Sequence, residues 1–124
     1  MSASETVLIV EDDDDLRAIL EHTFSRVGYE VVAVADGAVA LEYLEEADSP
    51  PDIIILDLLM PDVDGLAFLR QRADTNGQIP TIVLTGVDDE ETLAEAFELG
   101  ADDYITKPFS PKELVTRANH LNGA

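Results

Sequence analysis

Three carboxylates follow directly after apolar runs of this sequence. Glu11 and Asp12 come after "TVLIV" (6–10), and Asp57 comes after "DIIIL" (52–56). Carboxylates that lie close together cannot all ionise cheaply, and a hard divalent cation such as Mg²⁺ removes that penalty while keeping several of its waters. A carboxylate oxygen beside such a cation is a nucleophile suited to a phosphoryl group. If the two runs end side by side, Asp57 is therefore a candidate phosphate acceptor.

A hydroxyl and an ammonium group follow two later apolar runs. Thr85 closes "PTIVLT" (80–85), and Lys107 follows "DDYIT" (102–106). An ammonium can neutralise a phosphoryl oxygen as a point charge, and a hydroxyl can donate a hydrogen bond to another oxygen. Gly86, next to Thr85, is expected to leave room for the incoming group, because a side chain there would crowd it.

Strands and helices that could bring these residues together alternate along the chain. Apolar runs rich in β-branched residues are typical of strands covered on both faces, and helical spacing between them indicates helices. Such alternation predicts an α/β fold, a flavodoxin-like doubly wound (βα)5 sandwich whose five-stranded parallel sheet has the order 2-1-3-4-5. Residues 1–124 are expected to form one domain. The expected strands are 6–10, 30–34, 52–56, 80–85 and 102–106, and the expected helices are 11–28, 36–47, 64–73, 88–100 and one from 110 onward.

Helix ends and buried helix faces can also be assigned. Gly28 and Gly100 are expected to end helices, and Ser110 with Pro111 is expected to begin the last one. The residues expected to face the core are Leu16, Leu20, Phe24 and Val27 in the first helix, Ala40, Leu44 and Ala47 in the second, and Leu114, Ala118 and Leu121 in the last. In a sheet of this order, ligands bind at the carboxyl ends of strands one and three. Glu11, Asp12 and Asp57 are predicted to meet there.

The composition limits the class of function. The chain has 27 acidic residues against 7 Lys and Arg, a net charge of −20, and no cysteine. Such a surface repels nucleic acid and anionic lipid, and the missing cysteines favour a cytoplasmic location. Self-repulsion should destabilise the fold at low salt and fade at molar salt. A halophilic cytoplasm and an ordinary acidic protein both explain this charge.

Four segments of the sequence resemble the motifs of response-regulator receiver domains, the CheY-like family of two-component signal transduction. They are "VLIVEDDDDLR", "PDIIILDLLMPDVDG", "IPTIVLTG" and "GADDYITKPFSPKEL", and the resemblance runs from Thr6 to Leu121. It implies that Asp57 is the phosphorylation site. It further implies that Asp12, Asp57 and the backbone carbonyl of Leu59 bind Mg²⁺ directly, with Glu11 acting through water.

The same resemblance implies a switch and a set of partners. Thr85 and Tyr104 would form the switch pair, Lys107 would bridge the phosphoryl group, and the Lys107–Pro108 peptide bond would be cis. The phosphoryl donor would be a histidine kinase or a histidine phosphotransfer protein. Phosphorylation would change the surface formed by the helix at 88–100, the strand at 102–106 and the last helix, which would control an output domain or partner. The chain would be a phosphoacceptor rather than an enzyme, limited to self-catalysed phosphotransfer and autodephosphorylation.

One departure from the family concerns a phosphorylation-dependent homodimer. Family dimers formed through that surface usually pair basic residues of the fourth helix with acidic residues of the fifth. Here the fourth helix has no Lys or Arg and offers Glu90, Glu91, Glu95 and Glu98, which puts this dimer in doubt unless salt screens the repulsion.

Leu59 and Val87, expected beside the site, are apolar and offer no group to position an attacking water, so the phosphoryl group should be long-lived.

Other readings of the sequence remain open. A Mg²⁺-dependent phosphohydrolase could use Asp57 as a transient nucleophile, although Leu59 stands where such enzymes place a general acid. A binding module of the same fold that works without phosphorylation is the second alternative. Among the remaining acids, Asp13 could reach the metal, Asp14 and Asp15 are expected to cap a helix or be solvated, and turn or capping roles suffice for Asp62 and Asp64. His22 and His120 are expected to be solvated helix residues.

Overall fold

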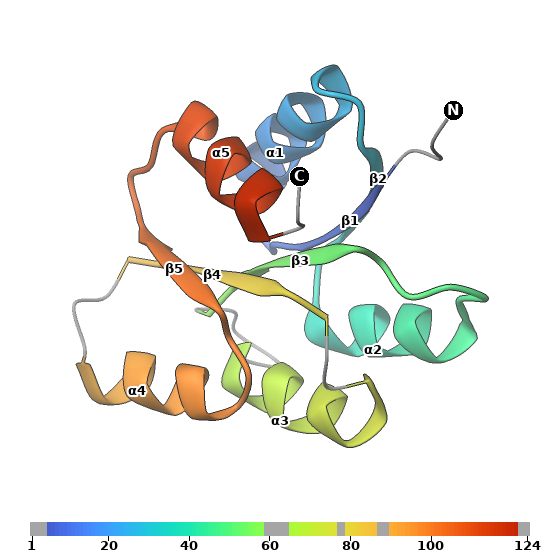
Figure 1. The fold of residues 1–124 in the computed structure, drawn as a ribbon, viewed down its shortest axis with the longest axis vertical. Helices are drawn as coiled ribbons and strands as arrows, with labels where there is room; N and C mark the ends of the chain where they lie inside the picture. The colour runs from blue at the N-terminus through green and yellow to red at the C-terminus, as the bar shows by residue number, and fades with distance from the viewer. Residues whose placement is uncertain (1–4, 59–64, 77–78, 87–89, 122–124) are drawn as a thin grey trace.

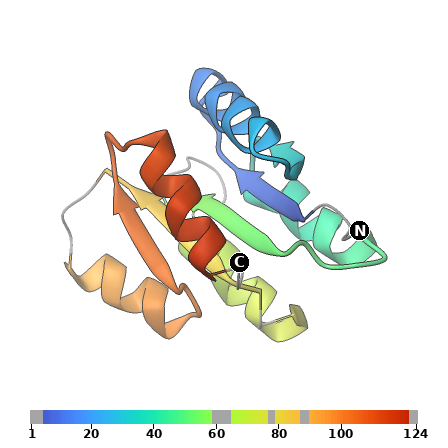
Figure 2. The ribbon, with the colours of Figure 1, turned by 45° about the horizontal axis from the view of Figure 1, so that its top comes forward.

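The computed structural model describes residues 5–58, 65–76, 79–86 and 90–121. Five parallel strands form one sheet in the order β2-β1-β3-β4-β5, which confirms the predicted topology. Figure 2 shows the strands running in the same direction, so that their carboxyl ends lie at one edge of the sheet. The strands are β1 (Thr6–Val10), β2 (Glu30–Val34), β3 (Ile53–Asp57), β4 (Thr81–Thr85) and β5 (Asp103–Thr106).

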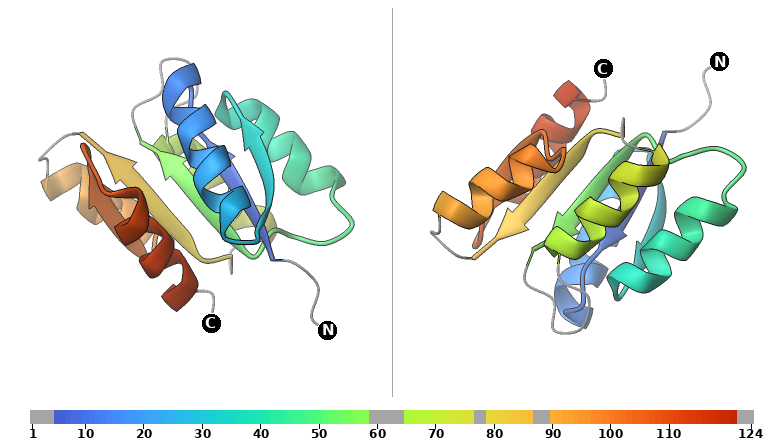
Figure 3. Two further views of the ribbon diagram at one scale, coloured as in Figure 1. Left: turned by 90° about the horizontal axis from the view of Figure 1, so that it is seen from above. Right: turned by 90° about the horizontal axis from the view of Figure 1, so that it is seen from below.

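Helices cover both faces of the sheet, as Figures 1 and 3 show. They are α1 (Asp14–Arg26), α2 (Gly37–Glu46), α3 (Gly65–Asn76), α4 (Glu90–Glu98) and α5 (Pro111–Leu121). On one face α1 and α5 bury residues such as Leu20, Phe24 and Leu114 against alternate residues of the strands. On the other face α2, α3 and α4 contribute residues such as Leu44 and Phe68 to a second core. Burial on both faces explains the near-continuous apolar sequences of the central strands.

The predicted element boundaries agree with the structure to within a few residues. The structure places Asp57 inside β3, as its last residue, whereas the sequence pattern ended that strand at residue 56. The helix predicted at 88–100 is shorter, because α4 ends at Glu98 and Gly100 adopts a positive φ of 111° in the following turn. Strand ends and helix ends are the positions where local patterns are weakest.

Val27 was wrongly assigned to the buried face of the first helix. It is the C-cap residue of α1, and 53% of its surface is exposed. The chain leaves the helical path there, since Gly28 follows with a φ of 101°, so the helical spacing no longer applies. Ala47 is similarly the C-cap of α2 and is only partly buried. Leu121, the last residue of α5, is partly buried and packs against the core.

The cap of the last helix is the predicted one, whereas α1 is capped by Asp13 and not by Asp14 or Asp15. The Asp13 carboxylate accepts hydrogen bonds from the backbone N–H groups of Asp15 (2.9 Å) and Leu16 (3.1 Å), which makes it the N-cap of α1. The hydroxyl of Ser110 accepts a bond from the Glu113 N–H at 3.3 Å, as expected for the last helix. Among the residues that the structure describes, no helix is long and apolar enough to cross a bilayer.

Candidate functional site

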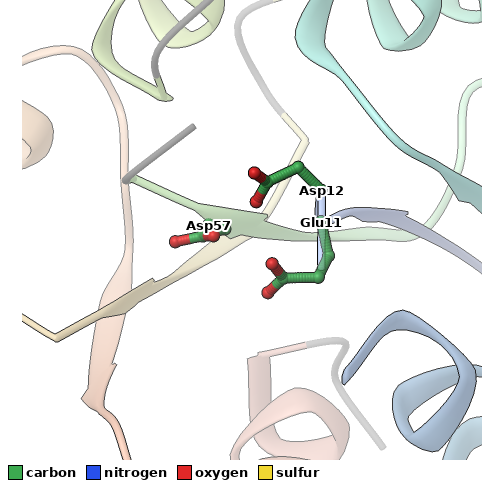
Figure 4. Close-up of side chains that lie close together, drawn as sticks. All are labelled: Glu11, Asp12 and Asp57. Carbon is green, nitrogen blue, oxygen red and sulfur yellow. The ribbon is translucent and has the colours of Figure 1, made fainter. Parts of the chain in front are cut away.

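The carboxyl ends of β1 and β3 bring three acidic side chains together, as the strand order predicted. Carboxylate oxygens of Glu11, Asp12 and Asp57 all lie within 4.8 Å of one another. Figure 4 shows the three side chains gathered at the ends of these neighbouring strands. Asp57 is held by β3 itself, while Glu11 and Asp12 stand just past the end of β1. We call these three residues together with Lys107 the strand-tip cluster.

Lys107 supplies a positive charge to this cluster from the end of β5. Its Nζ lies 3.3 Å from Oδ2 of Asp57 and 3.5 Å from Oε1 of Glu11. The backbone places it there because the Lys107 N–H donates to the Thr85 carbonyl at 2.8 Å, which continues the pairing of β5 with β4. The peptide bond to Pro108 is cis, as expected. One ammonium therefore faces two buried carboxylates, so the cluster retains an excess of negative charge.

Burial makes this negative charge costly. Glu11 has no exposed surface and Asp57 only 2%. The pKa of Glu11 is raised to about 7, first by burial and then by the neighbouring Asp57 carboxyl. The Asp13 N–H, which donates to Oε2 of Glu11 at 3.2 Å, and the ammonium of Lys107 act in the opposite direction. Within the described part of the chain, Oε1 of Glu11 is buried without a hydrogen-bond partner.

The donor set fits a hard divalent cation. Carboxylate oxygens are the ligands that Mg²⁺ prefers, and this ion usually takes one or two carboxylates and keeps several waters. A buried oxygen without a hydrogen-bond donor needs another electropositive partner, and either a metal-bound water or the metal itself would serve Glu11. Asp12 is partly exposed, which leaves the site open toward solvent. The carbonyl of Leu59, expected as a further ligand, lies outside the described residues.

Arg17 holds the segment that carries Glu11 and Asp12. The sequence pattern did not indicate this role of Arg17. Its Nη1 donates to the backbone carbonyl of Glu11 at 3.0 Å, and its Nη2 pairs with Asp14 at 2.6 Å. The acids next to Asp12 therefore have other roles, since Asp13 caps α1 and Asp14 pairs with Arg17. Neither belongs to the three-carboxylate group. The idea that Asp13 reaches the metal is not supported by this arrangement.

Gly65 is a second residue that shapes the site and that the sequence reasoning missed. A Cβ added to this residue would lie 2.6 Å from Cα of Leu58 and 2.9 Å from the carbonyl oxygen of Asp57. The Gly65 N–H also donates to the Leu58 carbonyl at 3.2 Å. A glycine is therefore required where α3 begins against the end of β3. The signal was present as a glycine after "PDVD", but nothing in the local pattern showed what lay opposite it.

The space beside Gly86 is open in the part of the chain that the structure describes, and crowding of an incoming group by a side chain there stays a prediction. A Cβ at Gly86 would have no atom within 4 Å among the described residues outside its own chain neighbours. Contacts within the protein therefore do not require a glycine at this position. Crowding of an incoming group is the remaining reason for a glycine there.

Thr85 and Tyr104 lie on the same face of the sheet. Tyr104 pairs in register with Val83, and Thr85 follows Val83 by two residues, so both side chains point toward the α4 side. Thr85 is almost fully buried, whereas Tyr104 is 40% exposed and packs edge-on against Phe97 of α4 with 6.0 Å between ring centroids. Tyr104 thus connects the edge of the sheet to α4. The two histidines lie on α1 and α5, and His120 is exposed.

Comparisons with known proteins agree with this geometry. Residues 7–119 match the family described as the response regulator receiver domain. The chain is similar to the response regulator SaeR of Staphylococcus epidermidis, with 44% identity over 93% of this chain and 49% of that protein. It is similar to the alkaline phosphatase synthesis transcriptional regulatory protein PhoP of Bacillus subtilis, with 37% identity over 95% of this chain and 48% of that protein. It therefore spans about half the length of these relatives.

Solved structures show the same fold. The chemotaxis protein CheY4 of Vibrio cholerae has a TM-score of 0.89 and 31% identity, covering 96% of this chain and 99% of that one. A response regulator from Chloroflexus aurantiacus, which its description calls putative, has a TM-score of 0.88 and 35% identity, covering 98% and 100%. The flavodoxin-like arrangement predicted from the strand pattern is therefore confirmed.

Proposed function

Because this chain belongs to the response regulator receiver domain family, we propose that it accepts a phosphoryl group on Asp57 in a Mg²⁺-dependent reaction. The donor is a histidine kinase or a histidine phosphotransfer protein. The observation that carries this proposal is the strand-tip cluster: three carboxylates within 4.8 Å, with the Lys107 ammonium 3.3 Å from Asp57. The wider class, a signalling domain of two-component systems, follows from the family itself.

Each carboxylate of the cluster would have a distinct part in holding the metal. Asp12 and Asp57 would bind Mg²⁺ directly, together with the carbonyl of Leu59, and Glu11 would act through water. The buried Oε1 of Glu11 supports its part, because it accepts no hydrogen bond within the described residues and a metal-bound water could donate to it beside the Lys107 ammonium. When bound, Mg²⁺ draws negative charge from the phosphoryl oxygens and holds them near Asp57.

The transfer is a displacement at phosphorus. A carboxylate oxygen of Asp57 forms a bond to phosphorus while the bond from phosphorus to the donor imidazole nitrogen breaks, and that nitrogen keeps the electron pair. Lys107 neutralises one phosphoryl oxygen, because its ammonium already lies within ion-pair distance of Asp57. The hydroxyl of Thr85 donates a hydrogen bond to a second oxygen. The product is an acyl phosphate on Asp57.

The acyl phosphate would act as a switch through Thr85 and Tyr104. Phosphorylation adds roughly −1.5 to −2 charges and three acceptor oxygens at Asp57. Movement of Thr85 toward one of these oxygens would vacate space on the face that it shares with Tyr104, and the Tyr104 ring would turn inward. Because that ring packs against Phe97, the change would reach α4. Phosphorylation would thereby shift the population between two packings of the surface formed by α4, β5 and α5.

The setting of this reaction is also part of the proposal. We place the chain in the cytoplasm, with residues 1–124 as a single domain that governs an output domain or a separate partner. Relatives of about twice the matched length are described as transcriptional regulators, which supports an output of that kind. The chain itself would not turn over a separate substrate.

The direct test is phosphorylation with acetyl phosphate and Mg²⁺, read by intact mass. Wild type should gain one phosphoryl group, and chelation of the metal should prevent the gain. Asp57→Asn should gain none. Asp15→Asn is a matched control at the start of α1, near the cluster, and should be labelled like wild type, because Asp15 is exposed and outside the three-carboxylate group.

Three results of this experiment would reject the proposal. Equal labelling of Asp57→Asn and wild type would place the acceptor elsewhere. Continuous release of phosphate without a phosphorylated protein would favour the phosphohydrolase, and no reaction at all would favour the binding module.

A further inference from the structure

The surface formed by α4, β5 and α5 carries exposed aromatic groups beside a groove. Phe97 is 42% exposed and Tyr104 40%, and their rings contact each other. A groove of about 320 Å³ begins at Tyr104 and runs between β5 and the start of α5, where it is lined by Thr106, Pro108, Phe109, Glu113 and Arg117. Figures 1 and 2 show α4, β5 and α5 together at one end of the sheet. We call this region the α4–β5–α5 face.

The charge of this face is strongly negative. Residues 90–121 contain seven carboxylates and three Lys or Arg residues, and Lys107 belongs to the strand-tip cluster. That leaves Lys112 and Arg117 against the seven acids. On α4, Glu90 and Glu98 are exposed, and Arg70 of α3 pairs with Glu95 at 3.0 Å. Helix α4 itself contributes no cation.

The one arginine on α5 is already engaged by this chain. Nη1 of Arg117 donates to both carboxylate oxygens of Asp103 at 3.0 Å, and Nη2 pairs with Glu113 at 3.2 Å. Asp103, and to a smaller extent Glu113, raise the pKa of Arg117. A guanidinium held by two carboxylates of its own chain has little left to offer the acidic α4 of a second copy.

Symmetry makes this charge pattern decisive. In a two-fold homodimer the same patch meets itself, so α4 acids of one copy would face the net negative α4–β5–α5 face of the other. Like charges brought together at an interface cost several kcal/mol and suppress that pairing. An oppositely charged partner gains from the same field, because long-range attraction accelerates encounter. The aromatic pair supplies the apolar contact that such a partner needs, and the neighbouring groove offers polar groups such as Thr106 and Glu113.

We propose that the α4–β5–α5 face docks a basic segment of a different protein, one that places an apolar side chain against Phe97 and Tyr104 and its Lys or Arg residues against the α4 carboxylates. The inference rests on the proposed function, since phosphorylation of Asp57 would alter the position of Tyr104. It adds the chemistry of the partner and excludes a second copy of this chain at ordinary ionic strength.

The test uses two synthetic amphipathic peptides with identical apolar positions. One has Lys and the other Glu at every polar position, and their affinity for the full chain is measured by fluorescence anisotropy at about 0.1 M KCl. The phosphorylated and unphosphorylated chains are compared. Intact mass reports the extent of phosphorylation separately, so a failure to accept phosphate is distinguishable from a failure to bind. Sedimentation equilibrium of the same samples reports self-association.

The Lys peptide should bind at least about tenfold more tightly than the Glu peptide, and phosphorylation should change its affinity. Phe97→Ala should weaken binding of the Lys peptide roughly tenfold, since aromatic anchors dominate such interfaces. Glu98→Gln should weaken it about twofold to fivefold, as expected for one exposed charge. Val39→Ala and Glu42→Gln, exposed on α2 at the other end of the sheet, are the matched controls and should change it less than about twofold.

Three results would overturn the inference. They are equal affinity for the two peptides, equal loss of binding in the α2 controls, and a dimer at about 0.1 M KCl that Phe97→Ala dissociates.

Discussion

Two fully buried charged side chains of this protein have opposite surroundings. Arg72 of α3 donates hydrogen bonds to the carbonyls of Ile79 (3.2 Å) and Gly100 (3.1 Å), and so ties the end of α3 to the loops before β4 and β5. Glu11 instead lies among charged groups, the carboxylates of Asp12 and Asp57 and the ammonium of Lys107. Burial lowers the pKa of Arg72, opposed by Asp102, and raises the pKa of Glu11.

This difference separates a structural charge from a charge held ready for a ligand. Arg72 meets neutral backbone carbonyls, which accept two of its protons. Glu11 shares one ammonium with Asp57 and lies close to Asp12, so an added cation would balance the remaining negative charge. Buried carboxylates gathered around one ammonium are therefore a better indicator of a site than the burial of a single charge.

Removing Arg72 should give the largest effect on stability. Arg72→Ala removes a donor from two carbonyls, although the Thr81 hydroxyl still donates to that of Ile79 at 3.0 Å, and it creates a cavity. We therefore expect a loss of about 3–5 kcal/mol in urea unfolding. Arg70→Ala is the matched control on the same helix, because Arg70 is exposed in a surface pair with Glu95, and it should cost less than about 1 kcal/mol. A loss for Arg72→Ala as small as that of the control would remove the structural side of the comparison.

Neutralising Glu11 should have the opposite sign. A pKa of about 7 in the folded state, against an ordinary 4.5, corresponds to about 3 kcal/mol of destabilisation once Glu11 is ionised in the folded protein. Glu11→Gln should therefore stabilise the metal-free protein at pH 8 by about 2–3 kcal/mol and weaken Mg²⁺ binding. Urea unfolding and Mg²⁺ titration of both proteins provide the measurements. A destabilised Glu11→Gln at pH 8 would show that this carboxylate is already satisfied.

The pH dependence follows from the same raised pKa. Below pH 4.5 Glu11 is protonated in both states, and its contribution to stability is fully present. Between pH 4.5 and about 7 the unfolded state ionises first, so metal-free stability falls, and the loss is complete above pH 7. Saturating Mg²⁺ should recover more stability at pH 8 than at pH 5, because protons compete with the cation for the same oxygens. Urea unfolding of the wild type across this range, compared with Glu11→Gln, isolates the contribution.

The close contact at Gly65 should give a smaller loss. Gly65→Ala forces a Cβ against the backbone of Leu58, and we expect a cost of about 1–3 kcal/mol together with slower phosphorylation, because the end of β3 must shift. Gly86→Ala is the control, since its Cβ meets open space, and its stability should remain within about 0.5 kcal/mol of wild type. Equal thermal stability of the two variants would mean that the start of α3 can relax away from the site.

Added salt should produce the smallest change in stability per charge. Its effect distinguishes exposed charges, which salt screens, from buried charges, which it screens less. The net charge of −20 is carried mainly by exposed acids, whose repulsion is screened when the Debye length falls to about 3 Å at 1 M salt. The melting temperature should rise from low salt to molar KCl, while the stabilisation by Glu11→Gln should persist because buried charges are screened less. Salt-independent melting would remove the case for a salt-rich cytoplasm.

Much of the fold was predictable because parallel strands covered on both faces leave apolar runs, and strand order then brings distant ends together. The predicted strand order alone places Asp57 beside Glu11 and Asp12. It did not find Arg72, whose carbonyl partners lie 7 and 28 residues away in sequence and carry no side-chain signal. Nor did it identify Gly65 as a contact with Leu58, since close approaches depend on the path of the chain between elements. Helical spacing likewise misplaced Val27, because it does not show where a helix stops.

The phosphoryl acceptor itself gives the most direct test. An acyl phosphate is reduced by borohydride to the alcohol, so phosphorylated protein treated in this way should yield homoserine at position 57 when its peptides are sequenced by mass spectrometry. Homoserine at residue 57 alone, dependent on Mg²⁺ and on prior phosphorylation, is the expected result. Homoserine at another acidic residue, or a phosphorylated protein with residue 57 unchanged, would contradict the assignment of Asp57.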